Sequence, residues 1–130
     1  MRPVERPSTE DVLAINARIL GRDDGLHDEG RLIGALGRVE MAAHYEGADL
    51  VAQATRLLAA LALAHAFIDG NKRTALWAAS AFWELNNLSL HADGYDELAE
   101  RLVAMVAVTG GREDEEMALE RWLRDHLTSR

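Results

Sequence analysis

The chain has 130 residues, of which 48% are hydrophobic and only 5% aromatic, and its formal net charge is −8. A chain of this length usually forms one domain around one hydrophobic core, and we expect a single domain over residues 1–130. The acidic balance argues against a nucleic-acid-binding protein, which needs a basic face. The absence of cysteine excludes disulfides and thiolate chemistry, and it is compatible with the cytoplasm, where we expect the protein to act.

Neither the N-terminus nor any apolar segment of the sequence predicts a membrane protein. No apolar segment follows the charged first residues, so we expect no signal peptide. The longest apolar run, Leu57–Ala64, is well short of the ~18 residues that a membrane-spanning helix needs.

Two helices are predicted in the first third of the chain. Ser8, with Asp11 three residues later, resembles a helix N-cap, and an apolar stripe continues from there until Gly21. A second helix is expected to begin at Asp28 or Glu29, with Leu32, Ile33, Leu36 and Val39 on its apolar side. Residues 40–49 are ambiguous, and we interpret them as an irregular connection or flap that ends at Gly47.

Four more helices are predicted in the rest of the chain. Their expected ranges are about Leu50 to Ala66, Asn71 to Leu85, Tyr95 to Val108 and Glu113 to Leu127. The first of these is apolar almost all round, so it should lie at the centre of the fold. Residues 88–91 alternate like a strand but are too few for a firm assignment, and residues 109–111 should end the fifth helix. The expected fold class is therefore all-α, a compact bundle of about six helices.

The joint between the third and fourth helices, His65-Ala66-Phe67-Ile68-Asp69-Gly70-Asn71-Lys72-Arg73, is unusually rich in chemically active side chains. We call it the 65–73 loop. The helix that follows should present unpaired N–H groups of Lys72, Arg73 and Thr74 together with the positive end of its dipole, which suits a phosphate. Gly70 has no side chain to keep a phosphate oxygen away from the backbone. Lys72, the only lysine of the chain, and Arg73 add full positive charge.

An acid and a base complete this loop. Asp69 is its only carboxylate, and one carboxylate with phosphate oxygens and water forms a normal Mg²⁺ shell. His65 is the one side chain there that can take up a proton near neutral pH. The combination suggests transfer of part of a nucleotide to a hydroxyl, and the lack of serine and cysteine in the loop favours direct transfer. Structural interpretations remain open, since His65 also suits a helix C-terminus and Asp69 or Asn71 could simply cap the next helix.

These residues resemble the signature of the Fic/Doc family, His-x-Phe-x-(Asp/Glu)-Gly-Asn-(Gly/Lys)-Arg. The matching residues are His65, Phe67, Asp69, Gly70, Asn71, Lys72 and Arg73, so every specified position is filled. The resemblance implies an all-α fold over the whole chain and a role for each residue. His65 would be the general base, Asp69 would bind Mg²⁺, Phe67 would attach the loop to the core, and residues around Arg38–Gly47 would form a flap that positions the target peptide. The phosphates of the nucleotide would be held by Gly70, Asn71, Lys72 and Arg73.

Two positions distinguish this chain from the adenylyl-transferring members of that family. Those members have glycine in place of Lys72 and a second arginine in place of Leu76. The run from Asn71 to Leu76 is instead similar to the Doc (death-on-curing) toxins. This resemblance implies transfer of the terminal phosphate of ATP, with Mg²⁺, to a protein hydroxyl, with a threonine of elongation factor Tu as the expected target.

The family's inhibitory pattern, (Ser/Thr)-x-x-x-Glu-(Gly/Asn), is incomplete here, because Ala42 precedes Glu46-Gly47 where serine or threonine is needed. We therefore expect inhibition by a separate, Phd-like antitoxin rather than by the chain itself. The alternatives left open are adenylyl transfer by the same site, a non-catalytic binding module that keeps the signature, and, more remotely, a toxin that cleaves nucleic acid.

Overall fold

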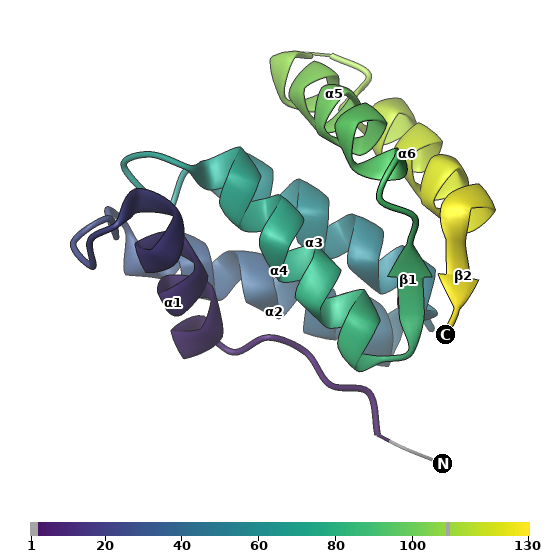
Figure 1. Cartoon of the computed structure of the whole chain (residues 1–130), viewed down its shortest axis with the longest axis horizontal. Coiled ribbons are helices and arrows are strands. Elements are labelled where there is room, and N and C mark those ends of the chain that lie inside the picture. The colour runs from purple at the N-terminus through teal and green to yellow at the C-terminus, as the bar shows by residue number, and fades with distance from the viewer. Residues whose placement is uncertain (1–2, 109) are drawn as a thin grey trace.

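The computed structural model describes residues 3–108 and 110–130, and it places six helices and one short strand pair within them (Figure 1). The helices are α1 (Thr9–Leu20), α2 (Glu29–Tyr45), α3 (Leu50–Ala64), α4 (Asn71–Leu85), α5 (Gly94–Ala107) and α6 (Arg112–His126). The strands β1 (Leu88–Leu90) and β2 (Leu127–Ser129) pair antiparallel. The predicted all-α bundle is confirmed. None of the described helices has the length and apolar character needed to cross a membrane.

Helix α3 forms the centre of the molecule, as its sequence predicted. It packs against α4 and α2 over most of its length and also contacts α5 and α6. Its buried side chains lie on nearly every face, and most are small or aliphatic: Ala54, Leu57, Leu58, Ala59, Ala60, Leu61 and Ala62. Alanine side chains let helix axes approach closely, so the end of α3 and the start of α4 are packed in fixed positions. Those ends are the ones joined by the 65–73 loop.

The first three helices begin with side-chain caps that the sequence predicted. Ser8 accepts a hydrogen bond from the backbone of Asp11, and the Asp11 carboxylate accepts one from the backbone of Ser8, so the N-cap interaction is reciprocal. Asp28 caps α2 and Asp49 caps α3 through one bond each, which the aspartate side chain accepts from the backbone of Arg31 and of Ala52. Each such cap stabilises a helix by about 1 kcal/mol.

Helix α2 is longer than predicted, and the interpretation of residues 40–49 as an irregular flap is wrong for its first part. The helix continues to Tyr45 because a buried stripe continues past Val39 to Ala42. Alanine at that position gives little hydrophobic signal in a sequence but packs well in a helix interface. Helix α3, by contrast, ends at Ala64 rather than Ala66, because His65 adopts a left-handed conformation.

After α6, strand β2 pairs with β1. The sequence predicted nothing of this strand pair beyond the weak alternation of residues 88–91. Leu88 pairs with Ser129 and Leu90 with Leu127, so the end of α6 is tied to the end of α4. Figure 1 shows α5 and α6 side by side on one side of the molecule and α1 on the other. Helix α5 ends at Ala107, slightly before residues 109–111, which were predicted to end it. Of these, Thr109 lies outside the described residues.

Candidate active site

The 65–73 loop begins with a residue in a rare backbone conformation. His65 has φ 51° and ψ 43°, in the left-handed region, and it forms the C-cap of α3. Histidine is among the few residues other than glycine that are enriched there. The turn leaves the His65 side chain exposed at the surface. The candidate base is therefore accessible to an incoming substrate.

The middle of the loop is fixed by Phe67 and Asn71. Phe67 is buried in the core and forms a β-bridge with Leu26, which agrees with the anchoring role expected for it. The Asn71 side chain accepts a hydrogen bond from the Phe67 N–H at 3.1 Å and donates one to the Phe67 carbonyl at 2.9 Å. Asn71 thus holds the loop closed on itself, and its predicted contact with phosphate would have to use its backbone N–H or its second amide hydrogen.

The start of α4 has free backbone donors. Its N-cap is Gly70, with φ 73°, and no described side chain caps the helix, in contrast to α1, α2 and α3. The Thr74 N–H already bonds to the Gly70 carbonyl at 2.8 Å, so the prediction that this group is free is wrong. Among the residues that the structure describes, the backbone N–H groups of Asn71, Lys72 and Arg73 have no hydrogen-bond partner.

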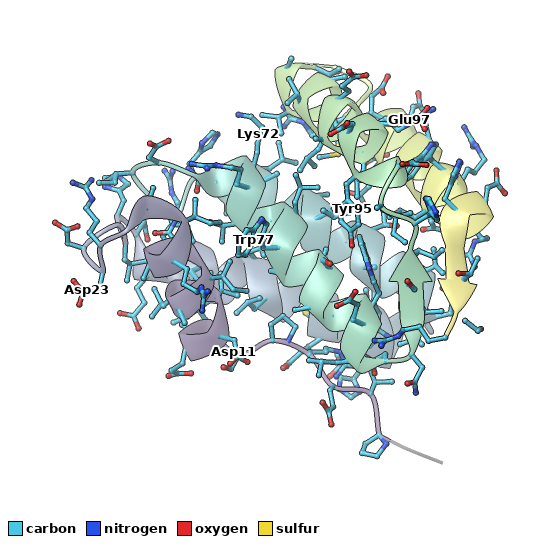
Figure 2. The ribbon with its side chains drawn as sticks, viewed as in Figure 1. Asp11, Asp23, Lys72, Trp77, Tyr95 and Glu97 are labelled. Carbon is cyan, nitrogen blue, oxygen red and sulfur yellow. The ribbon has the colours of Figure 1, made fainter. Side chains whose placement is uncertain are left out.

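Two cations stand at this helix start. Lys72 and Arg73 are exposed, and neither makes an ion pair with any residue in the described part of the chain. Figure 2 shows Lys72 at the end of α4 nearest the 65–73 loop. Positive side chains at a positively polarised helix start repel unless an anion lies between them, so the arrangement favours phosphate.

Asp69 lies directly before this helix start. One of its carboxylate oxygens accepts a hydrogen bond from the Gly70 N–H at 2.7 Å, and the side chain is exposed. Within residues 3–108 and 110–130, no three His, Cys, Asp or Glu side chains group closely enough to hold a metal ion. An exposed carboxylate is a ligand of the type that Mg²⁺ prefers, so Asp69 could supply one ligand to such an ion, with phosphate and water supplying the others.

A buried asparagine in α1, not identified from the sequence, supports the loop from below. Asn16 is only 2% exposed, and its amide nitrogen donates to the Asp69 carbonyl and to the Thr74 hydroxyl, each at 3.1 Å. A Cβ atom at Gly25 would lie 2.4 Å from the Asn16 amide oxygen, so a side chain at that position would displace Asn16. The signal was present, because Asn16 interrupts the apolar stripe of the first helix at an inward-facing position.

The segment that covers the loop is also different from the one expected. Residues 25–28 run along it: the Gly25 carbonyl accepts from Ile68, and the backbone N–H groups of His27 and Asp28 donate to Ala66, at 2.8 to 3.0 Å. The segment Arg38–Gly47 is not an irregular flap, because most of it belongs to α2. Its role in positioning the target peptide stays a prediction.

The remnant of the inhibitory pattern lies far from the site as well. Asp28, at the start of α2, contacts the loop, whereas Glu46 follows the end of the same helix. A helix rises 1.5 Å per residue, so the 17 residues of α2 separate the two by roughly 25 Å. Glu46 is instead paired with Arg56 at 3.6 Å. This placement agrees with the expectation that the chain does not inhibit itself.

Comparison with known proteins agrees with this geometry. Residues 6–83, which include α1 to most of α4 and the whole 65–73 loop, match the sequence profile of the Fic/DOC family. A protein named "Toxin Doc" from Mycolicibacterium smegmatis is 38% identical over 102 residues, covering 75% of this chain and 77% of that protein. A protein named "Protein kinase doc" from Escherichia phage P1 is 36% identical over 87 residues, covering 64% and 69% of the two chains. The chain belongs to the Fic/DOC family.

Proposed function

We propose that this protein is the toxin of a toxin–antitoxin pair and that it transfers the terminal phosphate of ATP, with Mg²⁺, to a protein hydroxyl. The observation that carries the proposal is the uncapped start of α4, with Gly70, Lys72 and Arg73, one short loop away from an exposed His65. The names of its relatives, "Toxin Doc" and "Protein kinase doc", support a toxin with kinase-like activity. We propose the cytoplasm as its place of action and a threonine of elongation factor Tu as its target.

Each residue has a defined task in this reaction. The backbone donors at the start of α4 and the side chains of Lys72 and Arg73 would hold the phosphates, and Asp69 would supply a ligand to Mg²⁺, which neutralises phosphate charge when bound. His65 would accept the proton of the target hydroxyl as its oxygen bonds to the terminal phosphorus. The bond from that phosphorus to the leaving ADP oxygen then breaks, so a phosphate ester and ADP are formed.

Adenylyl transfer is the principal alternative, and the structure bears on it at Leu76. Leucine has no guanidinium group, so this position does not supply the second arginine of adenylyl-transferring members, and its side chain is partly buried against the core. The two reactions are separated by incubating the protein with ATP, Mg²⁺ and elongation factor Tu and measuring the intact mass of the factor. We expect a gain of one phosphoryl group. A gain of one adenylyl group would assign the site to the other reaction.

The role of His65 is best tested with asparagine, which adopts the left-handed conformation more readily than alanine does. We expect His65→Asn to keep the melting temperature and to lower the transfer rate by about a hundredfold or more, because the general base is lost. His44→Asn, at an exposed histidine near the far end of α2, is the matched control and should keep full activity. If His65→Asn poisons cells as well as the parent protein does, the protein acts as a binding module instead.

We also propose that a Phd-like antitoxin neutralises the toxin by laying an amphipathic segment along the outer face of α4. A mainly apolar cavity of about 430 Å³ lies there, and its lining includes Trp77 of α4 and Tyr95 of α5. Figure 2 labels these two side chains. Trp77 is 53% exposed, which is unusual for so large an apolar side chain.

We expect Trp77→Ala to leave folding and toxicity intact while weakening antitoxin binding, because the segment loses its largest apolar contact. Val103→Ala, at a similarly exposed apolar residue on α5, is the control and should be neutralised normally. Binding is measured by calorimetry with the antitoxin and neutralisation by co-expression. Equal neutralisation of the two variants would rule out this face.

A further inference from the structure

A cavity of about 590 Å³ lies on the α2 side of the 65–73 loop, and the function proposed above makes no use of it. Its walls include Arg31 and Arg38 from α2 and Ala64 from the end of α3, and none of its lining residues belongs to the 65–73 loop. Ala64 directly precedes His65 in the chain, so the cavity reaches the residue next to the candidate base. It is separate from the phosphate-binding donors, which lie at the start of α4.

The charge of this cavity is opposite to that of the whole molecule. Arg31 and Arg38 are seven residues apart, so two helical turns bring them to the same side of α2. Arg31 is held at its Nε by Asp28 at 3.3 Å, which leaves the other nitrogens of its guanidinium free to donate. Arg38 makes no ion pair with any residue of the described ranges. In a chain with a net charge of −8, two guanidiniums beside one carboxylate form a local positive site.

Two glycines keep the space between the arginines open. Gly30 and Gly34 also line the cavity, although Gly34 lies inside α2, where glycine costs a helix about 1 kcal/mol relative to alanine. A Cβ atom at Gly34 would meet nothing within 4 Å, and one at Gly30 would meet only the Asp28 carboxylate at 3.4 Å. Packing inside the chain therefore does not require glycine at either position, whereas a side chain there would occupy the cavity.

We propose that Arg31 and Arg38 form an oxyanion-binding subsite that positions one of the two substrates beside His65. This inference rests on the proposed transfer reaction. Paired guanidiniums bind carboxylate and phosphate oxygens equally well in geometric terms, so the oxyanion is either an acidic side chain of the protein acceptor or a phosphate of the nucleotide. Arg31 and Arg38 are positioning residues in this scheme, because the proton transfer itself belongs to His65.

The subsite is tested first without turnover, so that the result does not depend on the reaction. Inorganic phosphate is titrated into isotope-labelled protein while the Nε–Hε signals of Arg31, Arg38 and Arg121 are followed by NMR. Arg121 is an exposed arginine of α6 and serves as an internal reference. We expect saturable shifts at Arg31 and Arg38 that exceed those at Arg121.

Two variants with the same change of charge sharpen this measurement. Arg38→Gln should lower the phosphate affinity measured from the shift at Arg31 by about tenfold, which corresponds to the loss of one charge-assisted hydrogen bond. It should leave the shifts of backbone amides at the start of α4 unchanged. Arg121→Gln should change neither. The proposal is overturned if Arg31 and Arg38 respond no more than Arg121, or if the two variants behave alike.

The source of the oxyanion is then found from steady-state kinetics of both variants. If the acceptor supplies it, Arg38→Gln should raise the KM for the protein acceptor by about tenfold and leave the KM for ATP unchanged; a nucleotide phosphate would produce the reverse. Either result supports the subsite, provided that the melting temperature is unchanged and that Arg38→Lys brings the raised KM part of the way back to the parent value. If neither KM changes, the positioning role is refuted, even where the transfer reaction itself is observed.

Discussion

At the scale of single residues, Gly21 and Gly70 form a natural pair because they share a backbone conformation and differ in surroundings. Both have φ 73° and ψ 19°, in the left-handed region. A Cβ atom at Gly21 would meet nothing within 4 Å, whereas one at Gly70 would lie 3.4 Å from Ile19 and from Leu20. The comparison separates the cost of the backbone conformation from any effect on the helix start that Gly70 caps.

We expect Gly21→Ala and Gly70→Ala each to lower the free energy of unfolding by about 1 to 2 kcal/mol, because alanine is strained in this conformation. Only Gly70→Ala should also weaken ATP binding, since its methyl group would press on Ile19 and Leu20 of α1 and so disturb the start of α4. Urea denaturation measures the first effect and calorimetry the second. Normal ATP binding by Gly70→Ala, or an equal loss in Gly21→Ala, would contradict the assignment of this helix start to phosphate.

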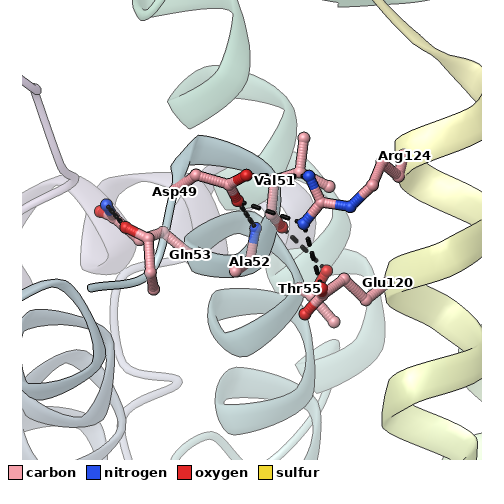
Figure 3. Close-up of polar contacts among 8 residues, drawn as sticks. Asp49, Val51, Ala52, Gln53, Thr55, Glu120 and Arg124 are labelled. Carbon is pink, nitrogen blue, oxygen red and sulfur yellow. Dashed lines mark hydrogen bonds and ion pairs between the residues drawn. The ribbon is translucent and has the colours of Figure 1, made fainter. Parts of the chain in front are cut away.

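At the scale of elements, α6 is attached to the start of α3 by an ion-pair network at the surface. Arg124 donates to Asp49 at 2.8 Å and to Glu120 at 3.0 Å, while Asp49 also accepts from the backbone of Ala52 (Figure 3). The hydrogen bond from Arg124, followed by the one from Ala52, lowers the pKa of Asp49 below its ordinary value of 3.8. Asp49 thus serves both as helix cap and as partner of another helix.

This lowered pKa has a definite consequence for stability. A carboxyl group whose pKa is lower in the folded state stabilises the fold at all pH values above its unfolded pKa, and this contribution is lost as the pH falls through the folded value. The contribution is therefore complete at neutral pH and disappears below 3.8. Since both side chains are about half exposed, solvent and salt keep the contribution within about 1 kcal/mol.

We expect Asp49→Asn to lower the free energy of unfolding by less than about 1 kcal/mol at pH 7, because asparagine still caps α3 but no longer carries the charge that pairs with Arg124. The difference from the parent protein should shrink as the pH falls below 3.8, where Asp49 itself becomes protonated. Urea denaturation from pH 7 to pH 3 measures both. Asp125→Asn, on the exposed side of α6, is the control, and a difference for Asp49→Asn that does not vary with pH would refute the argument.

At the scale of the whole molecule, one continuous core links all the described helices. It includes Val12 of α1, Leu32 of α2, Leu58 of α3, Phe82 of α4, Leu98 of α5 and Leu123 of α6. The β1–β2 pair joins the two ends of the helical hairpin formed by α5 and α6 to the end of α4. We therefore propose that the chain is a single cooperative domain.

The corresponding prediction concerns unfolding. Far-UV circular dichroism reports the helices. Tryptophan fluorescence reports Trp77, which is 53% exposed on α4, Trp83, which is fully buried beside α5, and Trp122, which is 6% exposed on α6. We expect both signals to change in one transition with the same midpoint in urea. Comparing the parent protein with a Trp122→Phe variant shows how much of the fluorescence change comes from Trp122. A separate, earlier transition of Trp122 would mean that α5 and α6 unfold on their own.

Much of this organisation was predictable from local patterns. The limits of α4 and the caps of α1 to α3 follow from side chains within a few residues of each helix end, and the prediction of these features is confirmed. The end of α2 was missed because Ala42 gives almost no hydrophobic signal, and β2 was missed because its partner lies 37 to 41 residues earlier in the chain. The roles assigned to the individual site residues stay predictions.

By itself, the sequence determined which chemical groups are available together, because His65, Asp69 and the cations at the start of α4 are neighbours in one short loop. Only the tertiary structure decided what holds that loop in place and what lies beside it. Asn16 reaches Asp69 across 53 residues, and residues 25–28 run along the loop through backbone hydrogen bonds. Such contacts depend on how whole helices pack, so no pattern of neighbouring residues contains them.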